Sequence, residues 1–214
     1  MKRFFLYFLI KVLAGAVLWF YLRLMQGVEI KGKKNIPLGR PVIFYSNHPS
    51  ALDPLFILTL GFWPQIIRHP EILPWPLAAE EVMKRFKLSW LLDYGCLPIR
   101  RGRGGAEVFH QAAAKLRQNQ NILIFPEGER TGQEGLDKLK GGIFVLWSLC
   151  PDVYFIPVKV SGTSRVFPPK TFWPRWCEQT IRISFGRRFL VGPDFRQGKK
   201  KEFLEMLSGL WNKT

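Results

Sequence analysis

The sequence predicts an α/β domain in which a mostly parallel or mixed β-sheet is flanked by helices. Short apolar runs at 41–46 (PVIFYS) and 121–125 (NILIF) are typical of buried strands. Segments with helical spacing of apolar residues alternate with these runs along the chain, which favours a layered α/β architecture. The length of 214 residues suits one such domain with an appended segment.

The expected elements begin after residue 26. Asp53 and Pro54 predict a helix start, because Asp is favoured at the N-cap and Pro at the first helical position. Four prolines within 64–76 predict a loop, and we expect a helix over 78–92 followed by a short strand over 96–99. The remaining expected elements are a helix over 106–117, a strand over 121–125, a helix over 143–149, strands over 153–160 and 179–190, and a helix over 203–211.

The N-terminal segment is apolar and close to bilayer length. Residues 4–22 contain one charged side chain, Lys11, in nineteen positions. Four interpretations remain open: a cleaved signal peptide with a site at 14–16, a membrane-spanning helix, a buried core helix, and a helix or helical hairpin that is partly inserted in one leaflet. Partial insertion lets Lys11 reach the interface and avoids a cost of about 2.5 to 3.5 kcal/mol at the bilayer centre. We therefore expect residues 1–26 to be an uncleaved membrane-anchoring segment and residues 27–214 to be the α/β domain.

The net charge indicates an anionic partner. The chain has 32 Lys and Arg residues against 16 Asp and Glu residues, a formal charge of +16. Nucleic acid and a phospholipid surface both fit this charge. The basic residues do not form a recognisable nucleic-acid motif, and the apolar N-terminus favours membrane lipids. The three cysteines form no CxxC pair, which argues against a disulfide framework and a cysteine zinc site.

The first candidate site follows the strand over 41–46. Here His48 and Asp53 are five residues apart, and a tight loop would bring the two side chains together. An imidazole held by a carboxylate is suited to act as a general base. The alternative is that Asp53 only caps the helix and that His48 is a loop residue. Ser50 is expected to be a structural hydrogen-bonding residue, and we expect no catalytic role for His69 or His110.

Two further loops at strand ends carry charged residues and glycines. The loop at 95–103 contains Arg100, Arg101 and Arg103 and is interpreted as an anion-binding loop or as a solvated basic turn. The loop at 125–131 follows a buried strand, where open α/β sheets bind ligands. Its Glu127 and Arg130 would bind a ligand or pair with each other.

Together these stretches resemble the glycerolipid acyltransferase family, which includes 1-acyl-glycerol-3-phosphate acyltransferase. The residues that carry the resemblance are His48 and Asp53 (the NHxxxxD motif), Gly95, Ile99 and Arg101 (the second block), Phe125 to Gly128 with Arg130 (the FPEGTR motif), and Ile156 to Val158 (the fourth block). Two positions depart from the family pattern. Glu129 stands where the family has Thr, and Pro98 replaces a larger apolar residue.

The resemblance implies transfer of a fatty acyl group from an acyl thioester to the free hydroxyl of 1-acyl-glycerol-3-phosphate, which gives phosphatidic acid. It implies that His48 is the general base, that Asp53 orients it, and that Arg101, Glu127, Gly128 and Arg130 bind the acceptor. The donor is acyl-CoA or an acyl carrier protein thioester, and neither a metal nor another cofactor is expected.

Other functions stay open at this point. The acceptor is alternatively glycerol-3-phosphate, another lysophospholipid or an amino-acid-containing lyso-lipid, and the alternative from another class is a non-catalytic membrane lipid-binding protein. We expect membrane lipids and not nucleic acid as partners, with the catalytic domain on the cytoplasmic side of the membrane. The aromatic, basic segment 167–176 is either a second contact with the lipid interface or an ordinary surface loop.

Overall fold

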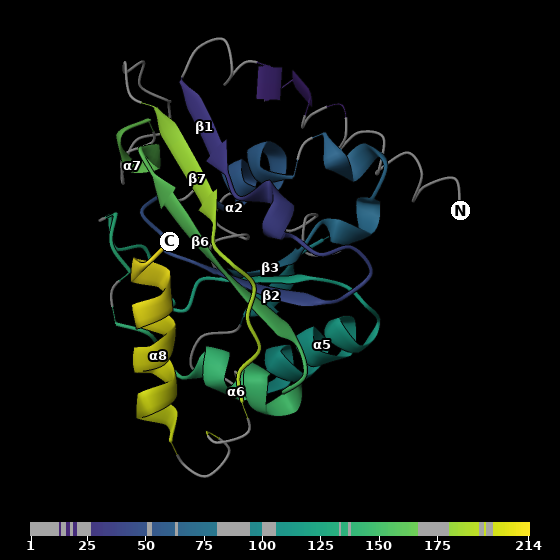
Figure 1. Ribbon diagram of the computed structural model, residues 1–214, viewed down its shortest axis with the longest axis vertical. Coiled ribbons are helices and arrows are strands. Elements are labelled where there is room, and N and C mark those ends of the chain that lie inside the picture. The colour runs from purple at the N-terminus through teal and green to yellow at the C-terminus, as the bar shows by residue number, and fades with distance from the viewer. Residues whose placement is uncertain are drawn as a thin grey trace.

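The computed structural model describes residues 13, 16–17, 19–20, 27–50, 53–62, 64–80, 95–99, 106–132, 134–136, 138–166, 180–192, 195 and 199–214. Within these residues a seven-stranded sheet runs through the molecule with helices on both of its faces (Figure 1). This arrangement confirms the predicted α/β class.

The sheet is mixed, with the strand order β1-β7-β6-β2-β5-β3-β4. The strands are β1 (Val28–Lys31), β2 (Val42–Ser46), β3 (Trp75–Ala79), β4 (Leu97–Ile99), β5 (Ile122–Ile124), β6 (Tyr154–Ser161) and β7 (Ile181–Phe185). β6 and β7 are antiparallel, and the other neighbouring pairs are parallel. β2 therefore lies in the middle of the sheet, between β6 and β5, and all three run in the same direction.

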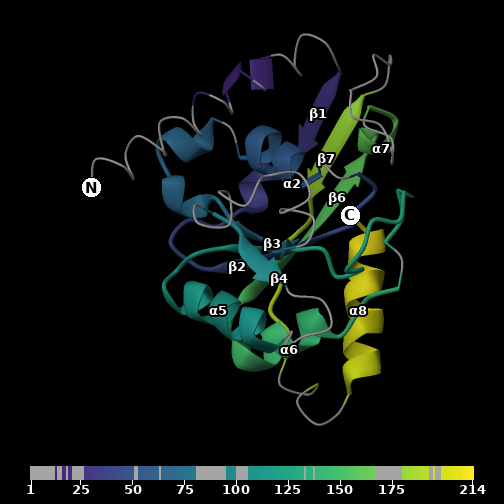
Figure 2. The same ribbon diagram turned by 180° about the vertical axis from the view of Figure 1, so that it is seen from behind.

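Helices cover the two faces unequally. The longer helices α5 (Ala106–Arg117), α6 (Gly142–Leu149) and α8 (Lys200–Asn212) pack on one face. The other face carries α2 (Asp53–Phe56), the π-helical η2 (Ile57–Gly61), α7 (Thr163–Val166) and the 3-10 turns η3 (Gln65–Ile67) and η4 (Pro70–Ile72); a further 3-10 turn, η1, spans Lys33–Asn35. Figures 1 and 2 show α5 and α6 together on one side of the sheet and α2 on the opposite side.

The central strand β2 is buried along its whole length. Its side chains alternate between the two cores: Ile43 and Tyr45 pack with α5, α6 and α8, whereas Val42 and Phe44 pack with the α2 side. A strand covered on both faces reads as a continuous apolar run, because both sets of alternate side chains are buried. This explains why the segment PVIFYS carries no polar alternation.

The structure corrects the end of the loop predicted over 64–76 and the start of the helix predicted over 78–92. Trp75 and Pro76 belong to β3 and not to the predicted loop, and Ala78 and Ala79 pair with β4 instead of starting a helix. Pairing with β5 and β4 decides the conformation here, and such tertiary context is invisible to local proline and helix signals. Residues 81–92 of the predicted helix lie outside the described residues.

Three further elements differ from the prediction. The strand expected over 179–190 ends at Phe185, and Phe189 forms an isolated bridge with Phe155. The short elements β1 and α7 were not predicted. Their four-residue length gives little periodicity, so each depends on its tertiary neighbours for stability.

Most of the predicted anchor lies outside the described residues. In the part of the segment that is described, Trp19 packs against the core on the α2 side, while Leu13, Val17 and Phe20 are 56%, 69% and 60% exposed. Among the helices of the described residues, none combines the length and the apolar character needed to cross a membrane. The segment 167–176 also lies outside the described residues.

Candidate active site

The predicted site residues gather where three neighbouring strands end. His48 follows β2, Glu127 follows β5 and Thr163 follows β6, and these strands are adjacent and parallel. Their carboxyl ends therefore meet at one edge of the sheet, which is where open α/β sheets place their ligands. Asp53 joins this group because α2 begins directly after the loop that leaves β2.

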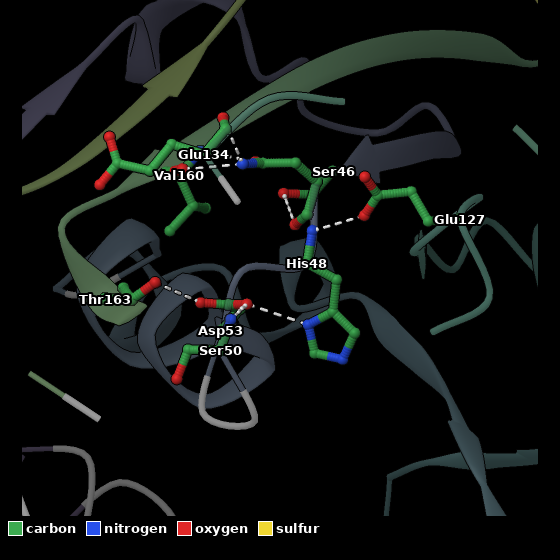
Figure 3. Close-up of polar contacts among 9 residues, drawn as sticks. Ser46, His48, Ser50, Asp53, Glu127, Glu134, Val160 and Thr163 are labelled. Carbon is green, nitrogen blue, oxygen red and sulfur yellow. Dashed lines mark hydrogen bonds and ion pairs between the residues drawn. The ribbon is translucent and has the colours of Figure 1, made fainter. Parts of the chain in front are cut away.

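His48 and Asp53 form a direct contact. The His48 Nδ1 atom lies 2.9 Å from Asp53 Oδ2, and the Asp53 side chain is completely buried (Figure 3). The same oxygen accepts a hydrogen bond from the backbone N–H of Ser50 at 2.6 Å, and Oδ1 accepts one from the Thr163 hydroxyl at 2.6 Å. The carboxylate of Asp53 thus bonds to groups around the site, which goes beyond the helix-capping alternative left open by the sequence.

Among the residues that the structure describes, none forms a hydrogen bond with the second ring nitrogen of His48, Nε2. Figure 3 shows Nε2 pointing away from Asp53, and the side chain is 17% exposed. Phe125 stacks on the imidazole with ring centroids 4.3 Å apart and an interplanar angle of 26°. When Nδ1–H donates to the carboxylate, the lone pair of Nε2 is available to accept a proton. Phe125 therefore holds one face of the ring and Asp53 holds one edge, which leaves Nε2 as the basic atom that faces a substrate.

The loop after β5 holds the backbone of His48 from both sides. Glu127 is 2% exposed, and its Oε2 accepts a hydrogen bond from the His48 N–H at 2.8 Å. The Thr131 N–H donates to the His48 carbonyl at 3.2 Å. The sequence left open a pairing of Glu127 with Arg130, and it did not predict the hydrogen bond that Glu127 accepts from the backbone of His48.

Glycine is favoured at position 128. Gly128 has a φ of +71°, in the left-handed region, and its N–H closes a turn onto the Phe125 carbonyl at 3.0 Å. A Cβ atom there would lie 2.9 Å from the Cδ atom of Lys140. The ammonium group of Lys140 lies 3.0 Å from the carboxylate of Glu129, the residue that departs from the family pattern, and both side chains are exposed. The negative charge of Glu129 is therefore paired.

Two supporting residues were missed as functional candidates. Asn47 is buried and joins the end of β2 to β6: its amide nitrogen donates to the carbonyls of Val160 and Glu134, and its oxygen accepts the Val160 N–H. Thr163 is buried beside Asp53. One signal was present in the sequence, since Thr163 comes three residues after the end of the predicted strand over 153–160, close to the spacing of two residues between the strand over 41–46 and His48.

The other predicted residues fall into separate places. Ser50 is buried and contacts Asp53 through its backbone N–H. His69 lies near the surface beside Glu71, and His110 is exposed on α5. Arg130 is exposed in the loop between Glu127 and Thr131, whereas Arg101 lies outside the described residues. In the part of the chain that the structure describes, no group of three or more His, Cys, Asp or Glu side chains is placed to hold a metal ion.

A family model described as acyltransferase matches residues 27–161, which contain the whole of this site except Thr163. The chain belongs to the acyltransferase family. Two relatives illustrate its range. Over 145 residues the chain is 26% identical to a chloroplastic 1-acyl-sn-glycerol-3-phosphate acyltransferase of Arabidopsis thaliana, covering 66% of this chain and 38% of the relative. Over 130 residues it is 32% identical to a lyso-ornithine lipid O-acyltransferase of Pseudomonas aeruginosa, covering 58% of this chain and 45% of the relative.

The fold of this acyltransferase has a counterpart among solved structures. The 1-acyl-sn-glycerophosphate acyltransferase PlsC of Thermotoga maritima superposes with a TM-score of 0.64 and 21% sequence identity, covering 92% of this chain and 76% of that one. At this identity the likeness shows a shared fold. The chain spans less than half the length of the two sequence relatives named above, so their activities enter below only as support for a proposal.

Proposed function

We propose that this acyltransferase moves a fatty acyl group from an acyl thioester to the free hydroxyl of 1-acyl-glycerol-3-phosphate, giving phosphatidic acid. The observation that carries the proposal is the contact of 2.9 Å between His48 and Asp53, with Nε2 of His48 open, in a chain of the acyltransferase family. The name of the Arabidopsis relative supports this choice of acceptor.

The proposed reaction needs one general base. The acceptor hydroxyl gives its proton to Nε2 of His48 while its oxygen attacks the thioester carbonyl, so that a C–O bond forms. The C–S bond then breaks, and the leaving sulfur takes the proton from the imidazolium. Asp53 holds Nδ1–H and stabilises the imidazolium while it carries the charge. The acyl group passes directly to the acceptor, and Ser50, which contacts Asp53 through its backbone, is not a nucleophile.

The only co-substrate in this scheme is the thioester, as acyl-CoA or as acyl carrier protein. Neither a metal nor another cofactor has a role in the proposed step, because proton transfer at His48 is sufficient to activate the hydroxyl and to protonate the leaving thiolate.

The acceptor phosphate would be held by Arg130 together with Arg101. Arg130 sits in the loop that bonds to the backbone of His48 through Glu127 and Thr131, so a phosphate bound there is close to the base. The planar fork of arginine suits phosphate oxygens. Glu127 would keep this loop in register with His48, and Gly128 would let the backbone approach the acceptor closely.

A lyso-lipid with an amino-acid headgroup is the second candidate acceptor. The relative with 32% identity is a lyso-ornithine lipid O-acyltransferase, and Glu129 adds a carboxylate where the family has Thr. A carboxylate would favour a headgroup that carries an ammonium group. The ion pair between Glu129 and Lys140 opposes this reading, since it compensates the added negative charge. We therefore rank the phosphorylated acceptor first.

We also propose that residues 1–26 anchor the enzyme to a membrane, with the catalytic domain on the cytoplasmic side. Leu13, Val17 and Phe20 are exposed apolar residues at helical spacing, and such a stripe is suited to the interface of a bilayer. The charge of +16 favours a surface with anionic lipids. Membrane lipids are therefore the proposed partners.

An acyl-transfer assay with a panel of acceptors tests this function. Membranes containing the enzyme are supplied with 1-acyl-glycerol-3-phosphate, glycerol-3-phosphate or lyso-ornithine lipid, each with acyl-CoA and with acyl carrier protein. We expect 1-acyl-glycerol-3-phosphate to be acylated fastest. His48→Ala should abolish turnover, and His110→Ala is the matched control that removes an exposed imidazole and keeps wild-type rates. Turnover by folded His48→Ala protein at the wild-type rate would refute the base assignment.

The acceptor site has its own test. Arg130→Ala should raise KM for the phosphorylated acceptor by about 10-fold to 100-fold, since a charged hydrogen bond contributes roughly 1.5 to 3 kcal/mol. KM for the thioester should change little. An unchanged KM for the acceptor contradicts phosphate binding by Arg130, and preferential acylation of the lyso-ornithine lipid makes the second candidate the function.

A further inference from the structure

We propose that Thr163 is a positioning residue for the catalytic pair: its hydroxyl fixes the rotation of the Asp53 carboxylate and thereby the proton on Nδ1 of His48. This inference rests on the proposed function, because the pair has a catalytic meaning only in a base-assisted transfer. Thr163 lies two residues beyond the end of the matched family region, and it is 110 residues away from Asp53 in the chain.

The hydrogen bonds of Asp53 divide between its two oxygens. Oδ2 faces His48 Nδ1 at 2.9 Å and the Ser50 N–H at 2.6 Å. Oδ1 accepts the hydroxyl of Thr163 at 2.6 Å, a length typical of an O–H bond to an ionised carboxylate. Asp53 and Thr163 are both completely buried, so the Thr163 hydroxyl supplies the hydrogen bond to Oδ1 that water would supply to an exposed carboxylate.

The torsion at the end of an aspartate side chain is broad, so neighbours must hold the group in place. With donors on both oxygens, the carboxylate has one favourable orientation, and in that orientation Oδ2 faces the imidazole. Without the Thr163 hydroxyl, Oδ1 loses its hydrogen bond, while Oδ2 keeps the bonds from His48 and Ser50. The carboxylate then turns to share the Ser50 N–H between its two oxygens, and the bond to His48 weakens as a result.

The position of Thr163 is itself fixed by backbone. It begins α7 directly after Gly162, whose φ of +84° lies in the left-handed region. A Cβ at position 162 would come within 2.5 Å of the Thr180 carbonyl oxygen, so the close approach of two backbones sets this turn. The Gly162 N–H donates to Glu134 Oε1 at 2.9 Å. At the other end of α7, Val166 is buried in the core. Contacts at both ends of this short helix therefore keep the Thr163 hydroxyl in place.

The substitution Thr163→Val keeps the volume of the side chain and removes the hydroxyl. We expect kcat to fall about 10-fold to 100-fold, with KM for both substrates within about twofold of wild type, because the acceptor and donor sites are untouched. Thr163→Ser restores the hydroxyl and should recover kcat to within about threefold. Thr59→Val is the matched control, since among the described residues the Thr59 hydroxyl bonds to the backbone carbonyl of Leu55, one turn earlier in α2, and not to the catalytic pair. Wild-type kcat in folded Thr163→Val protein overturns the proposal.

A second readout does not depend on turnover. NMR of the full-length protein with isotope-labelled histidine reports the Nδ1 proton of His48, and His48→Ala identifies its signal among the three histidines. We expect a single protonated Nδ1 in wild type and Thr163→Ser, and an exchanging or shifted signal in Thr163→Val. If Thr163→Val does not fold, Thr163→Ala is measured in its place. An unchanged His48 signal in Thr163→Val overturns the positioning role even if no acceptor is acylated. If Thr163→Val shifts the signal while the wild-type protein acylates no acceptor, only the proposed function is refuted.

Discussion

Replacing Asp53 by Asn removes a charge while nearly preserving shape, and the structure shows which bonds survive. Asn has one orientation that suits its neighbours: its amide oxygen takes the place of Oδ2, where it accepts from Ser50 N–H and from His48. Its NH2 group then faces Thr163, whose hydroxyl turns to accept instead of donating. We therefore expect Asp53→Asn to fold with little loss of stability.

The loss in rate comes from the missing charge. A hydrogen bond to a charged group contributes roughly 1.5 to 3 kcal/mol and one between neutral groups roughly 0.5 to 1.5 kcal/mol, so their difference is about 1 to 1.5 kcal/mol. The attraction between an imidazolium and a carboxylate at about 4 Å is at most about 4 kcal/mol for an effective dielectric constant near 20. Since each 1.36 kcal/mol is a factor of ten, kcat for Asp53→Asn should fall between about 10-fold and 1000-fold.

The assay compares kcat for acyl transfer with the midpoint of thermal unfolding in the same preparations. Glu71→Gln is the matched control: it neutralises the carboxylate beside His69, at 3.1 Å on the surface, and should change neither quantity. Asp53→Leu leaves two buried donors, the Ser50 N–H and the Thr163 hydroxyl, and the partly exposed His48 Nδ1–H without their acceptor, and it should destabilise the fold by roughly 2 to 6 kcal/mol. Wild-type kcat in folded Asp53→Asn protein would show that the charge of this carboxylate is not used in the reaction.

Three further outcomes are expected. Gly162→Ala should lower the midpoint of thermal unfolding by more than about 4 °C, because a side chain there is strained and meets the Thr180 carbonyl. Gly209→Ala in α8, with open space around it, should raise the midpoint by about 1 to 4 °C. Equal shifts for the two variants contradict this expectation. Burial raises the pKa of Tyr45, so its neutral form stabilises the fold below about pH 10 and this contribution is lost as the pH rises further. Tyr45→Phe should therefore show a shallower loss of stability above pH 10, and an unchanged slope counts against it. Deleting residues 1–24 should release much of the protein from membranes on fractionation, and full retention refutes the anchor.

Local sequence signals were sufficient to predict the strands that are apolar runs and the helices that have a regular apolar period. Apolar runs marked β2, β5 and β6, and polar residues directly after them marked the edge of the sheet where His48 and Glu127 lie. Parallel strands bring their carboxyl ends to one edge, so strand type and direction were enough to predict that loops distant in sequence share a site. The helices α5, α6 and α8 were predicted for a similar reason, since their periodicity spans two or more turns.

The contacts that support the site could not be predicted, because each depends on which strands are neighbours. Thr163 reaches Asp53 and Asn47 reaches Val160 only when β6 lies beside β2, and no local pattern states that order. β3 was misread for the same reason: its proline suggests a loop until β5 and β4 are present as partners. Hydrogen bonds between residues more than a hundred positions apart are properties of the topology.

The position of His48 depends finally on how β2 is held along its own axis. At the start of the strand, the Asn121 side chain accepts the Val42 N–H at 2.9 Å and donates to the Ile72 carbonyl at 2.7 Å. At its end, Asn47 exchanges hydrogen bonds of 2.9 Å with Val160 on β6. A slip of one residue would move His48 by about 3.3 Å and turn every side chain of β2 to the wrong core. Two buried asparagines therefore fix the register that brings the imidazole to Asp53, and they do so through hydrogen bonds to backbone groups.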